Sequence, residues 1–267
     1  MPGDADEEAS RSREVAAATD AARAAMVRAG RISRTRRTAA LDVLRRDVSA
    51  NQPQPWTPAG FQVARDRQIA LLEAFADREG LWLELDSLGE RKRGRLEHDI
   101  FRPIPFAGIA YKVTKGPKFG FYPHCPGNIV SDRVEELFEL HPATPAQYLT
   151  RLEVWDQIAF DLTRFEGFTR MDNRFGIVTS QTWFEARNAT WIEISNHLRA
   201  LGYQPVRTAS YDDPTHWYHP AQDIALFDVG TSNILWSQGH LLPIDIVPIH
   251  PDDIMRATIH EVLGIRG

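Results

Sequence analysis

The chain has 267 residues, 43% of them apolar, which is enough for one domain with an appendage or for two small lobes. Its net charge of −5 is mild, so composition alone favours neither nucleic acid nor a membrane surface as a partner. The single cysteine, Cys125, excludes an intramolecular disulfide, and no apolar run approaches the length of a membrane-spanning helix, about 18 residues. We therefore expect a soluble, cytoplasmic protein with no membrane partner.

Basic residues are concentrated near the N-terminus. Arg11–Arg46 contains ten arginines against three acids, and the segment is otherwise rich in alanine. This composition favours a helix but offers few large apolar side chains to bury. We predict that residues 1–50 form a helical or disordered arm that is largely solvated. Residues 11–46 could bind an acidic partner or nucleic acid.

The elements expected in the first half of the chain are mostly strands. Three prolines predict a linker over residues 51–58, and apolar spacing then predicts a helix that ends before Gly80. The following elements are expected in this order: a strand over 81–85, a mobile turn over 88–95, strands over 98–102 and 109–114, a loop over 115–127 and a helix over 131–140.

The second half of the chain is predicted to mix helices and strands. Thr144 and Thr190 are expected to cap helices over 144–160 and 190–201. A strand is expected between these helices at 175–181. Three further strands and a closing helix follow at 224–227, 233–236, 241–247 and 252–262. This order favours an α+β protein in which a small, strand-rich lobe precedes a mixed lobe.

The residues with the most chemical content lie near the C-terminus. Asn233 follows Asp228 by five residues, and Asp245 follows Asn233 by twelve. A hairpin turn at Gly239 brings Asn233 and Asp245 to the same end of two paired strands. Carboxylate and amide oxygens are the hard ligands that Mg²⁺ prefers, and phosphoryl transfer needs such charge neutralisation. The alternative is a hairpin whose Asp and Asn side chains only cap turns.

These residues give the chain a resemblance to the protein-kinase superfamily. Asp228-x4-Asn233 resembles the catalytic loop, and Asp245 resembles the metal-binding aspartate of the following strand. A closer resemblance is to the kinase-like domains of polyvalent proteins from phages and mobile elements. It is carried by Tyr148-Leu-Thr-Arg151-Leu, by Ile177–Gln181 and by Pro243-Ile-Asp245, and it extends from Pro58 to His250.

The resemblance implies a two-lobed, kinase-like fold after the N-terminal arm. The N-lobe is expected at residues 57–180 and the C-lobe at residues 181–267. Only 22 residues follow Asp245, so the C-lobe is expected to be reduced, without room for an activation segment or a large helical subdomain. The chain also departs from the family pattern at Leu226-Phe227, where protein kinases have His-Arg, and at Ile246-Val247, where they have Phe-Gly.

The resemblance also implies roles for residues in both lobes. Lys112, on the 109–114 strand, is expected to contact the α- and β-phosphates of ATP, with Lys115 and Lys118 as neighbouring alternatives. A helix glutamate should pair with Lys112. Glu153 is the first choice for this role, and Glu135 or Glu136 are the alternatives. Gln181–Trp183 should receive the adenine, and the Leu88–Arg95 turn should lie over the phosphates.

The expected reaction is transfer of the γ-phosphoryl group of ATP to a hydroxyl of an unknown protein or small-molecule acceptor. Asp228 would orient and deprotonate that hydroxyl, while Asn233 and Asp245 would hold Mg²⁺. Two alternatives remain open. One is a pseudokinase or nucleotide-binding interaction module, which the reduced C-lobe favours. The other is a protein that binds a partner or nucleic acid through its arginine-rich arm.

Overall fold

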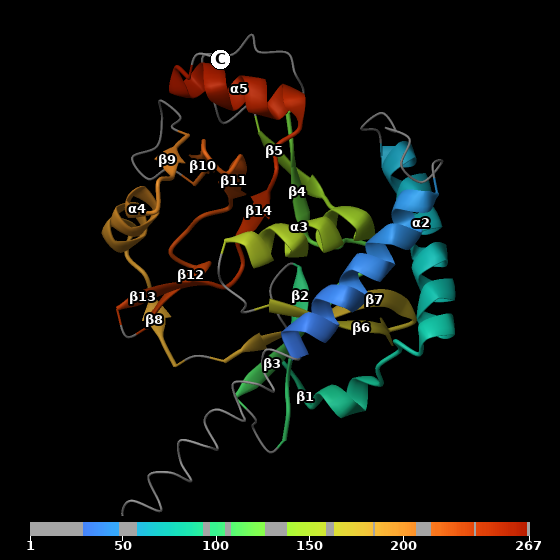
Figure 1. Cartoon of the computed structure of the whole chain (residues 1–267). Helices are drawn as coiled ribbons and strands as arrows, with labels where there is room; N and C mark the ends of the chain where they lie inside the picture. The colour runs from blue at the N-terminus through green and yellow to red at the C-terminus, as the bar shows by residue number, and fades with distance from the viewer. Residues whose placement is uncertain are drawn as a thin grey trace, which may run out of the picture.

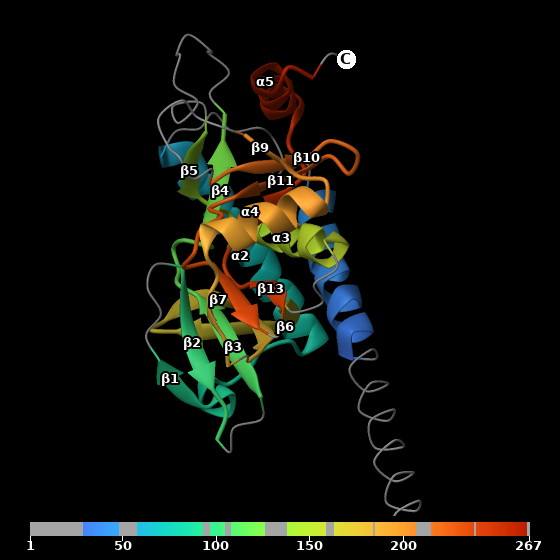
Figure 2. The ribbon, with the colours of Figure 1, turned by 90° about the vertical axis from the view of Figure 1, so that its left-hand side faces the viewer.

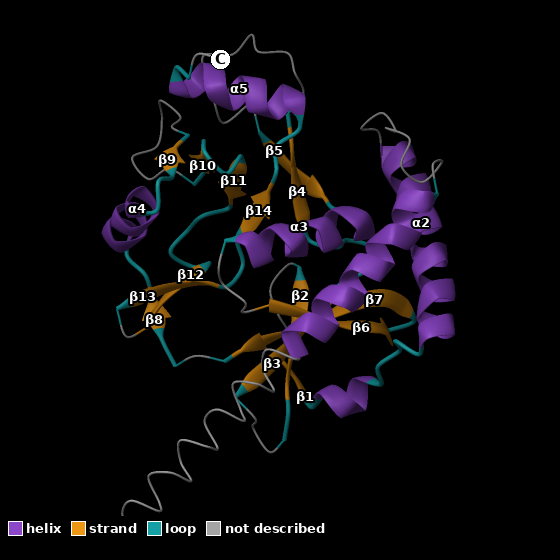
Figure 3. Ribbon diagram, in the orientation of Figure 1, coloured by secondary structure: helices purple, strands orange, loops and turns teal. Residues whose placement is uncertain are grey.

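The protein is a mixed α+β structure (Figures 1 and 3). The computed structural model describes residues 29–47, 58–92, 97–104, 108–125, 138–158, 163–183, 185–206, 215–237 and 239–265. Among these residues, no helix is both long enough and apolar enough to cross a bilayer.

A five-stranded antiparallel sheet forms one half of the molecule, in the order β1-β2-β3-β7-β6. Its strands are β1 (Glu90–Lys92), β2 (His98–Arg102), β3 (Ile109–Thr114), β6 (Thr163–Met171) and β7 (Arg174–Thr182). A short 3₁₀ helix, η1 (Leu85–Leu88), precedes the sheet. Side chains alternate across the strands, so Lys112 and its cross-strand partner Thr179 point to the same face.

The other half of the molecule contains smaller sheets. One contains β9 (Gln204–Pro205), β10 (Trp217–His219), β11 (Ile224–Phe227) and β14 (Val247–Ile249), in the order β14-β11-β10-β9. A second contains β8 (Arg187–Asn188), β12 (Ile234–Ser237) and β13 (His240–Pro243), and a third pairs β4 (Phe121–His124) with β5 (Glu139–Pro142). The helices here are α4 (Trp191–Ala200) and α5 (Asp253–Leu263).

Helix α3 (Pro145–Gln157) lies between these two halves, with the five-stranded sheet on one side and β9–β11 on the other (Figure 2). Thr144 caps it, because the Thr144 hydroxyl accepts from the Gln147 N–H and the Gln147 side chain returns to the Thr144 N–H. Of its residues, Tyr148, Leu149, Leu152 and Trp155 belong to the main hydrophobic core.

The described part of the predicted arm packs against the protein. Residues 29–46 form a helix beside α2 (Pro58–Glu79), and Ala40, Leu41 and Leu44 are buried in the same core as α3 (Figure 1). The prediction of a solvated arm is therefore wrong for this segment. A few apolar residues on one helical face suffice, because α2 and α3 already provide an apolar surface for them.

Several sequence predictions are confirmed by the structure, and several are wrong. The strands at 98–102 and 109–114 and the helices beginning near residues 58, 145, 191 and 253 form as expected. Residues 81–85 make only one isolated bridge, from Trp82 to Phe168, because the chain then turns into η1. The 88–95 turn contains β1, the 115–127 loop contains β4, and the 241–247 strand is broken between β13 and β14.

Two predicted elements lie mainly outside the described residues, namely the 51–58 linker and the 131–140 helix. Within the second of these, residues 139 and 140 begin β5. Strand β6 was not predicted from the sequence. This strand contains a bulge between Phe165 and Gly167, and the bulge interrupts the alternation of apolar and polar residues by which a strand is identified.

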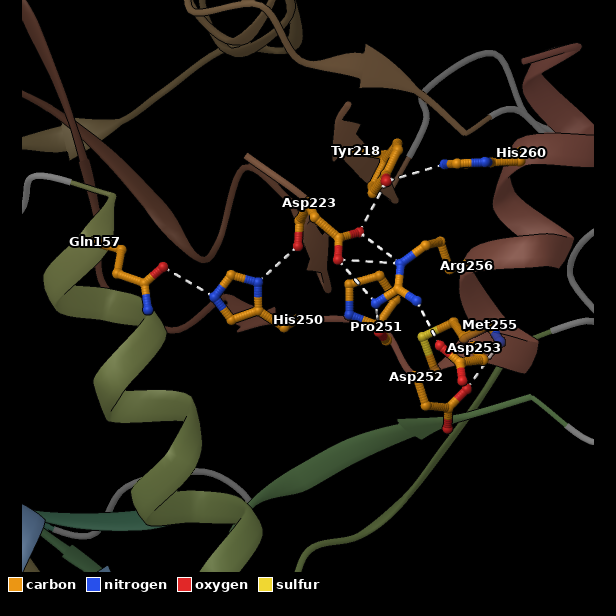
Figure 4. Close-up of polar contacts among 10 residues, drawn as sticks. All are labelled: Gln157, Tyr218, Asp223, His250, Pro251, Asp252, Asp253, Met255, Arg256 and His260. Atoms are coloured by element: carbon orange, nitrogen blue, oxygen red, sulfur yellow. Dashed lines mark hydrogen bonds and ion pairs between the residues drawn. The ribbon is translucent and has the colours of Figure 1, made fainter. Parts of the chain in front are cut away.

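A polar network fixes α5 and the end of α3 to the β10–β11 turn (Figure 4). The Asp223 carboxylate accepts hydrogen bonds from the Tyr218 hydroxyl at 2.9 Å and from the Arg256 guanidinium at 2.8 and 3.0 Å. The Asp223 carbonyl oxygen lies 2.7 Å from His250 Nδ1, and His250 Nε2 lies 2.9 Å from the Gln157 side-chain oxygen on α3. One aspartate thus joins two helices to the sheet.

Candidate active site

A cavity of about 690 Å³ lies between the five-stranded sheet and the β12–β13 hairpin. From the sheet side it is lined by Glu97, His98, Ile100, Ala110, Lys112, Gln181 and Trp183. From the other side it is lined by Asn188, Asp228, Ser232, Asn233, Leu235, Ile244 and Asp245. The structure thus brings together five of the six site residues predicted from the sequence, from segments far apart in the chain.

Lys112 lies on β3, paired across the sheet with Ile100 and Thr179. Its ammonium group donates a hydrogen bond of 2.5 Å to the carbonyl oxygen of Ile244, the residue before Asp245. Burial lowers the pKa of Lys112, and the negative charge of Asp245 opposes this effect only in part. A lysine in this environment is a partly desolvated cation that faces the cavity.

Asp228 and Asn233 bracket the loop that enters the hairpin. Asp228 has a φ of +55°, a conformation that Asp and Asn tolerate better than most residues. The Asn233 side-chain amide donates to the Asp228 carbonyl oxygen at 2.8 Å, so it closes the loop. The Asn233 carbonyl oxygen accepts from the backbone N–H groups of Ile244 at 2.8 Å and Asp245 at 3.3 Å. These bonds hold the two predicted metal ligands beside each other.

The two aspartates have opposite electrostatic environments. Burial raises the pKa of Asp228, and the negative charge of Asp245 raises it further. Burial also acts to raise the pKa of Asp245, but the positive charge of Lys112, with smaller effects from His98 and Arg151, outweighs it and lowers the pKa. Asp245 is therefore the better permanent anion and Asp228 the better proton acceptor.

A buried ion pair between Arg151 and Glu97 lies next to Asp245. It was not predicted from the sequence. Arg151 of α3 has only 3% exposure, and its guanidinium lies 3.3 Å from the Glu97 carboxylate and 4.0 Å from that of Asp245. The other Glu97 oxygen accepts from the Phe121 N–H at 3.1 Å, and the Arg151 guanidinium also donates to the Phe121 carbonyl oxygen at 3.3 Å. Gly120 permits this approach, because a Cβ there would lie 2.9 Å from Glu97.

His98 is the second residue that the sequence analysis missed. Its Nε2 lies 3.0 Å from the Tyr148 hydroxyl, and its Nδ1 lies 3.9 Å from the Asp245 carboxylate. Burial lowers the pKa of His98 to about 3, so the ring is neutral at physiological pH. Potential ligand atoms of Glu97, His98 and Asp245 all lie within 4.8 Å of one another. No alternation along β2 indicates this role, because His98 and the next residue, Asp99, are both buried.

The end of β7 and the residue that follows it also line the cavity. Gln181 at the end of β7 is 5% exposed, and its side-chain nitrogen has no hydrogen-bond partner among the described residues. Trp183 is 41% exposed, and the Arg102 guanidinium lies 5.3 Å from the centre of its ring. Ala110, the cross-strand neighbour of Gln181, and Leu235 add apolar side chains to the lining. An aromatic ring with one or two polar groups matches such a surface.

Glu153, the predicted partner of Lys112, lies elsewhere. It projects from the outer face of α3, and its carboxylate lies 3.0 Å from the Arg45 guanidinium. The prediction failed because Glu153 and Arg151 are two residues apart and face different sides of the helix. The alternatives Glu135 and Glu136 lie outside the described residues. Of the alternative lysines, Lys115 pairs with Asp99 at 3.2 Å and Lys118 is exposed.

The turn predicted to cover the phosphates is described only in part. Glu90–Lys92 forms the edge strand β1, residues 93–96 lie outside the described residues, and Glu97 contributes to the cavity lining. In comparisons with family models, curated proteins and solved structures, nothing matches this chain.

Proposed function

We propose that this chain has a two-lobed, kinase-like fold, binds Mg·ATP in the cavity and transfers the γ-phosphoryl group to a hydroxyl acceptor. The main support is that Lys112 and Asp245, which lie in different halves of the chain, line one cavity with Asp228 and Asn233. A cation facing a set of oxygen ligands is what phosphoryl transfer requires, because the reaction depends on positioning and charge neutralisation.

The residues fit the proposed metal by the chemistry of their donors. The low pKa of Asp245 keeps its carboxylate ionised, and the Asn233 side chain adds an amide oxygen, so both supply the hard oxygen ligands of Mg²⁺. Bound Mg²⁺ would neutralise phosphate charge. Lys112 would hold the α- and β-phosphates, and Asp228, whose pKa is raised by burial, would accept the proton of the acceptor hydroxyl. The adenine of ATP would lie near Gln181 and Trp183.

The experiment is ATP turnover with Mg²⁺, comparing the native chain with Asp228→Ala and Asp245→Ala. Loss of the proton acceptor should slow turnover by about 10²–10⁴-fold, and loss of Asp245 should also weaken Mg·ATP binding. Asp66→Ala is the matched control, because Asp66 is an exposed aspartate on α2 that forms an ion pair with its neighbour Arg65. Turnover that is unchanged in both site variants would falsify the assignment.

A second candidate function is nucleotide binding without transfer. It is favoured by the Lys112 ammonium, which already donates to the Ile244 carbonyl oxygen, and by α3, which presents Arg151 instead of a glutamate to the site. This candidate predicts that Mg·ATP binds, that Lys112→Met abolishes binding, and that no phosphate is released or transferred. Calorimetric titration beside a turnover assay separates the two functions.

Partner binding through the arginine-rich arm remains a proposal for its exposed arginines only. Arg37 is buried against α3 and is not presented to a partner, whereas Arg45 stays exposed beside Glu153. If the arm binds nucleic acid, binding should weaken steeply with salt and should survive Arg37→Met. Filter binding to a short duplex at two salt concentrations tests this proposal.

A further inference from the structure

The side of the cavity lined by Glu97, His98 and Asp245 has the composition of a metal site. Two carboxylates and a neutral imidazole place possible ligand atoms within 4.8 Å of one another. Such a set binds divalent metals readily, and imidazole and carboxylate together suit Mn²⁺ or Zn²⁺. A metal bound here would share the Asp245 carboxylate with the proposed Mg·ATP and would compete with it.

The protein already provides a cation at this cluster. The Arg151 guanidinium lies 3.3 Å from Glu97 and 4.0 Å from Asp245, so it contacts two of the three members. Two further bonds hold the pair in place, because Glu97 accepts from the Phe121 N–H and Arg151 donates to the Phe121 carbonyl oxygen. Arg151 also lies over the Tyr148 ring, with its guanidinium carbon 5.6 Å from the ring centre. Packing and hydrogen bonds thus fix its position.

We propose that Arg151 is the resident cation of the Glu97–His98–Asp245 cluster, and that it makes the cavity bind a divalent metal only together with a polyphosphate. Arg151 balances the charge of Glu97, while Lys112 faces Asp245. A bare metal ion meets two fixed positive charges beside Asp245, and a metal–polyphosphate complex, which is an anion, is attracted by the same charges. The polyphosphate half of this inference rests on the proposed function.

The inference predicts opposite changes for two kinds of ligand. Arg151→Met leaves Glu97 and Asp245 as acids without their arginine, so bare Mn²⁺ should bind about tenfold more tightly and ADP about tenfold more weakly. Glu97→Gln removes a negative charge and should have the opposite effect. It should weaken the binding of bare Mn²⁺ and strengthen the binding of ADP. Arg151→Lys keeps the charge and should stay close to the native chain. A variant that only loses structure should bind both ligands more weakly, so it would not show these opposite changes in affinity.

In the first experiment, the full chain is titrated with Mn²⁺ alone and binding is monitored by electron paramagnetic resonance. In the second, it is titrated with ADP plus Mn²⁺ and binding is measured by calorimetry. The matched control is Arg37→Met, because Arg37 is also buried at 4% exposure and ion-paired, but it contacts the outer face of α3. Arg37→Met should leave both affinities unchanged. If Arg151→Met does not fold, the same two titrations of Glu97→Gln and Arg151→Lys test the inference.

The outcomes separate this inference from the proposed function. Mn²⁺ affinity that stays at the native value or falls in Arg151→Met, or that rises in Glu97→Gln, overturns the role of Arg151. A native chain that binds no nucleotide overturns the proposed function, whereas the titration with Mn²⁺ alone still decides whether Arg151 occupies the cluster.

Discussion

The two faces of α3 carry similar chemistry in different surroundings. On the outer face, Arg37 from the 29–46 helix donates to the Leu152 carbonyl oxygen at 3.1 Å and to the Asp156 carboxylate at 2.8 Å. On the inner face, Arg151 pairs with Glu97 and approaches Asp245. Both arginines are almost fully buried, and the Nε of each has no hydrogen-bond partner among the described residues.

The comparison shows that a buried ion pair does not by itself indicate a functional site. The Arg37 pair joins two helices, and neither partner lines the large cavity. The Arg151 pair lies next to Asp245, which lines the cavity and is 40% exposed. We therefore expect changes on the outer face to alter stability and changes on the inner face to alter ligand binding. The following predictions test that division.

The largest effect is expected at the inner face. Lys112→Met should reduce Mg·ATP turnover or binding by about 10²–10³-fold, because it removes the cation that holds the phosphates in the proposed function. The melting temperature should change little, since burial already disfavours the charged form of Lys112. Turnover, calorimetry and thermal unfolding measure these quantities. Lys118→Met, at an exposed lysine, is the control, and an equal loss there would contradict the assignment of Lys112.

The next effect is expected at the outer face. Arg37→Met should lower the free energy of unfolding by about 3 kcal/mol, because it leaves the largely buried Asp156 carboxylate without its partner. Nucleotide affinity should not change. Urea unfolding followed by circular dichroism measures the loss, and Arg45→Met, at a more exposed pair, should cost less than about 1 kcal/mol. A loss of nucleotide affinity in Arg37→Met would remove the proposed distinction between the faces.

A smaller, pH-dependent effect on stability is expected at Asp223 in the β10–β11 turn. Burial acts to raise the pKa of Asp223, but hydrogen bonds from Arg256 and Tyr218, together with the charge of Arg256, lower it below its usual value. The unfolded chain therefore takes up a proton more readily, so the stabilisation by Asp223 is present above about pH 4 and is lost as the pH falls further. Asp223→Asn should remove this dependence and cost about 1 kcal/mol at neutral pH.

Urea unfolding between about pH 3 and 6 tests this prediction in the native chain and in Asp223→Asn. Asparagine also tolerates the left-handed backbone, which has a φ of +53° at this position, so the substitution isolates the charge. Equal pH dependence in the two proteins would show that Asp223 does not couple α5 to the sheet through its carboxylate.

The smallest effect is expected at Glu153. Glu153→Gln should cost between about 0.2 and 1 kcal/mol, because its pair with Arg45 is partly exposed. Turnover should equal that of the native chain, because Glu153 does not line the cavity. A large loss of turnover would mean that Glu153 leaves Arg45 and reaches the site when nucleotide binds.

The sequence by itself determined the elements that rest on local patterns. The strand that carries Lys112 was predicted correctly, because alternating residues define which side chains share a face of a strand. The hairpin after Asn233 was predicted from its glycine turn, and it brings Asn233 and Asp245 to one end. These predictions needed no knowledge of what packs against either element.

Only the tertiary structure decided which face of α3 meets the cavity. Arg151 and Glu153 are both charged residues in the same helix, and their spacing does not indicate which of them is buried. Packing of residues 29–46 on the outer face settles the rotation of α3, and Glu97 then meets Arg151 from a segment 54 residues away. Contacts of this kind depend on the summed burial of several elements, which no short stretch of sequence contains.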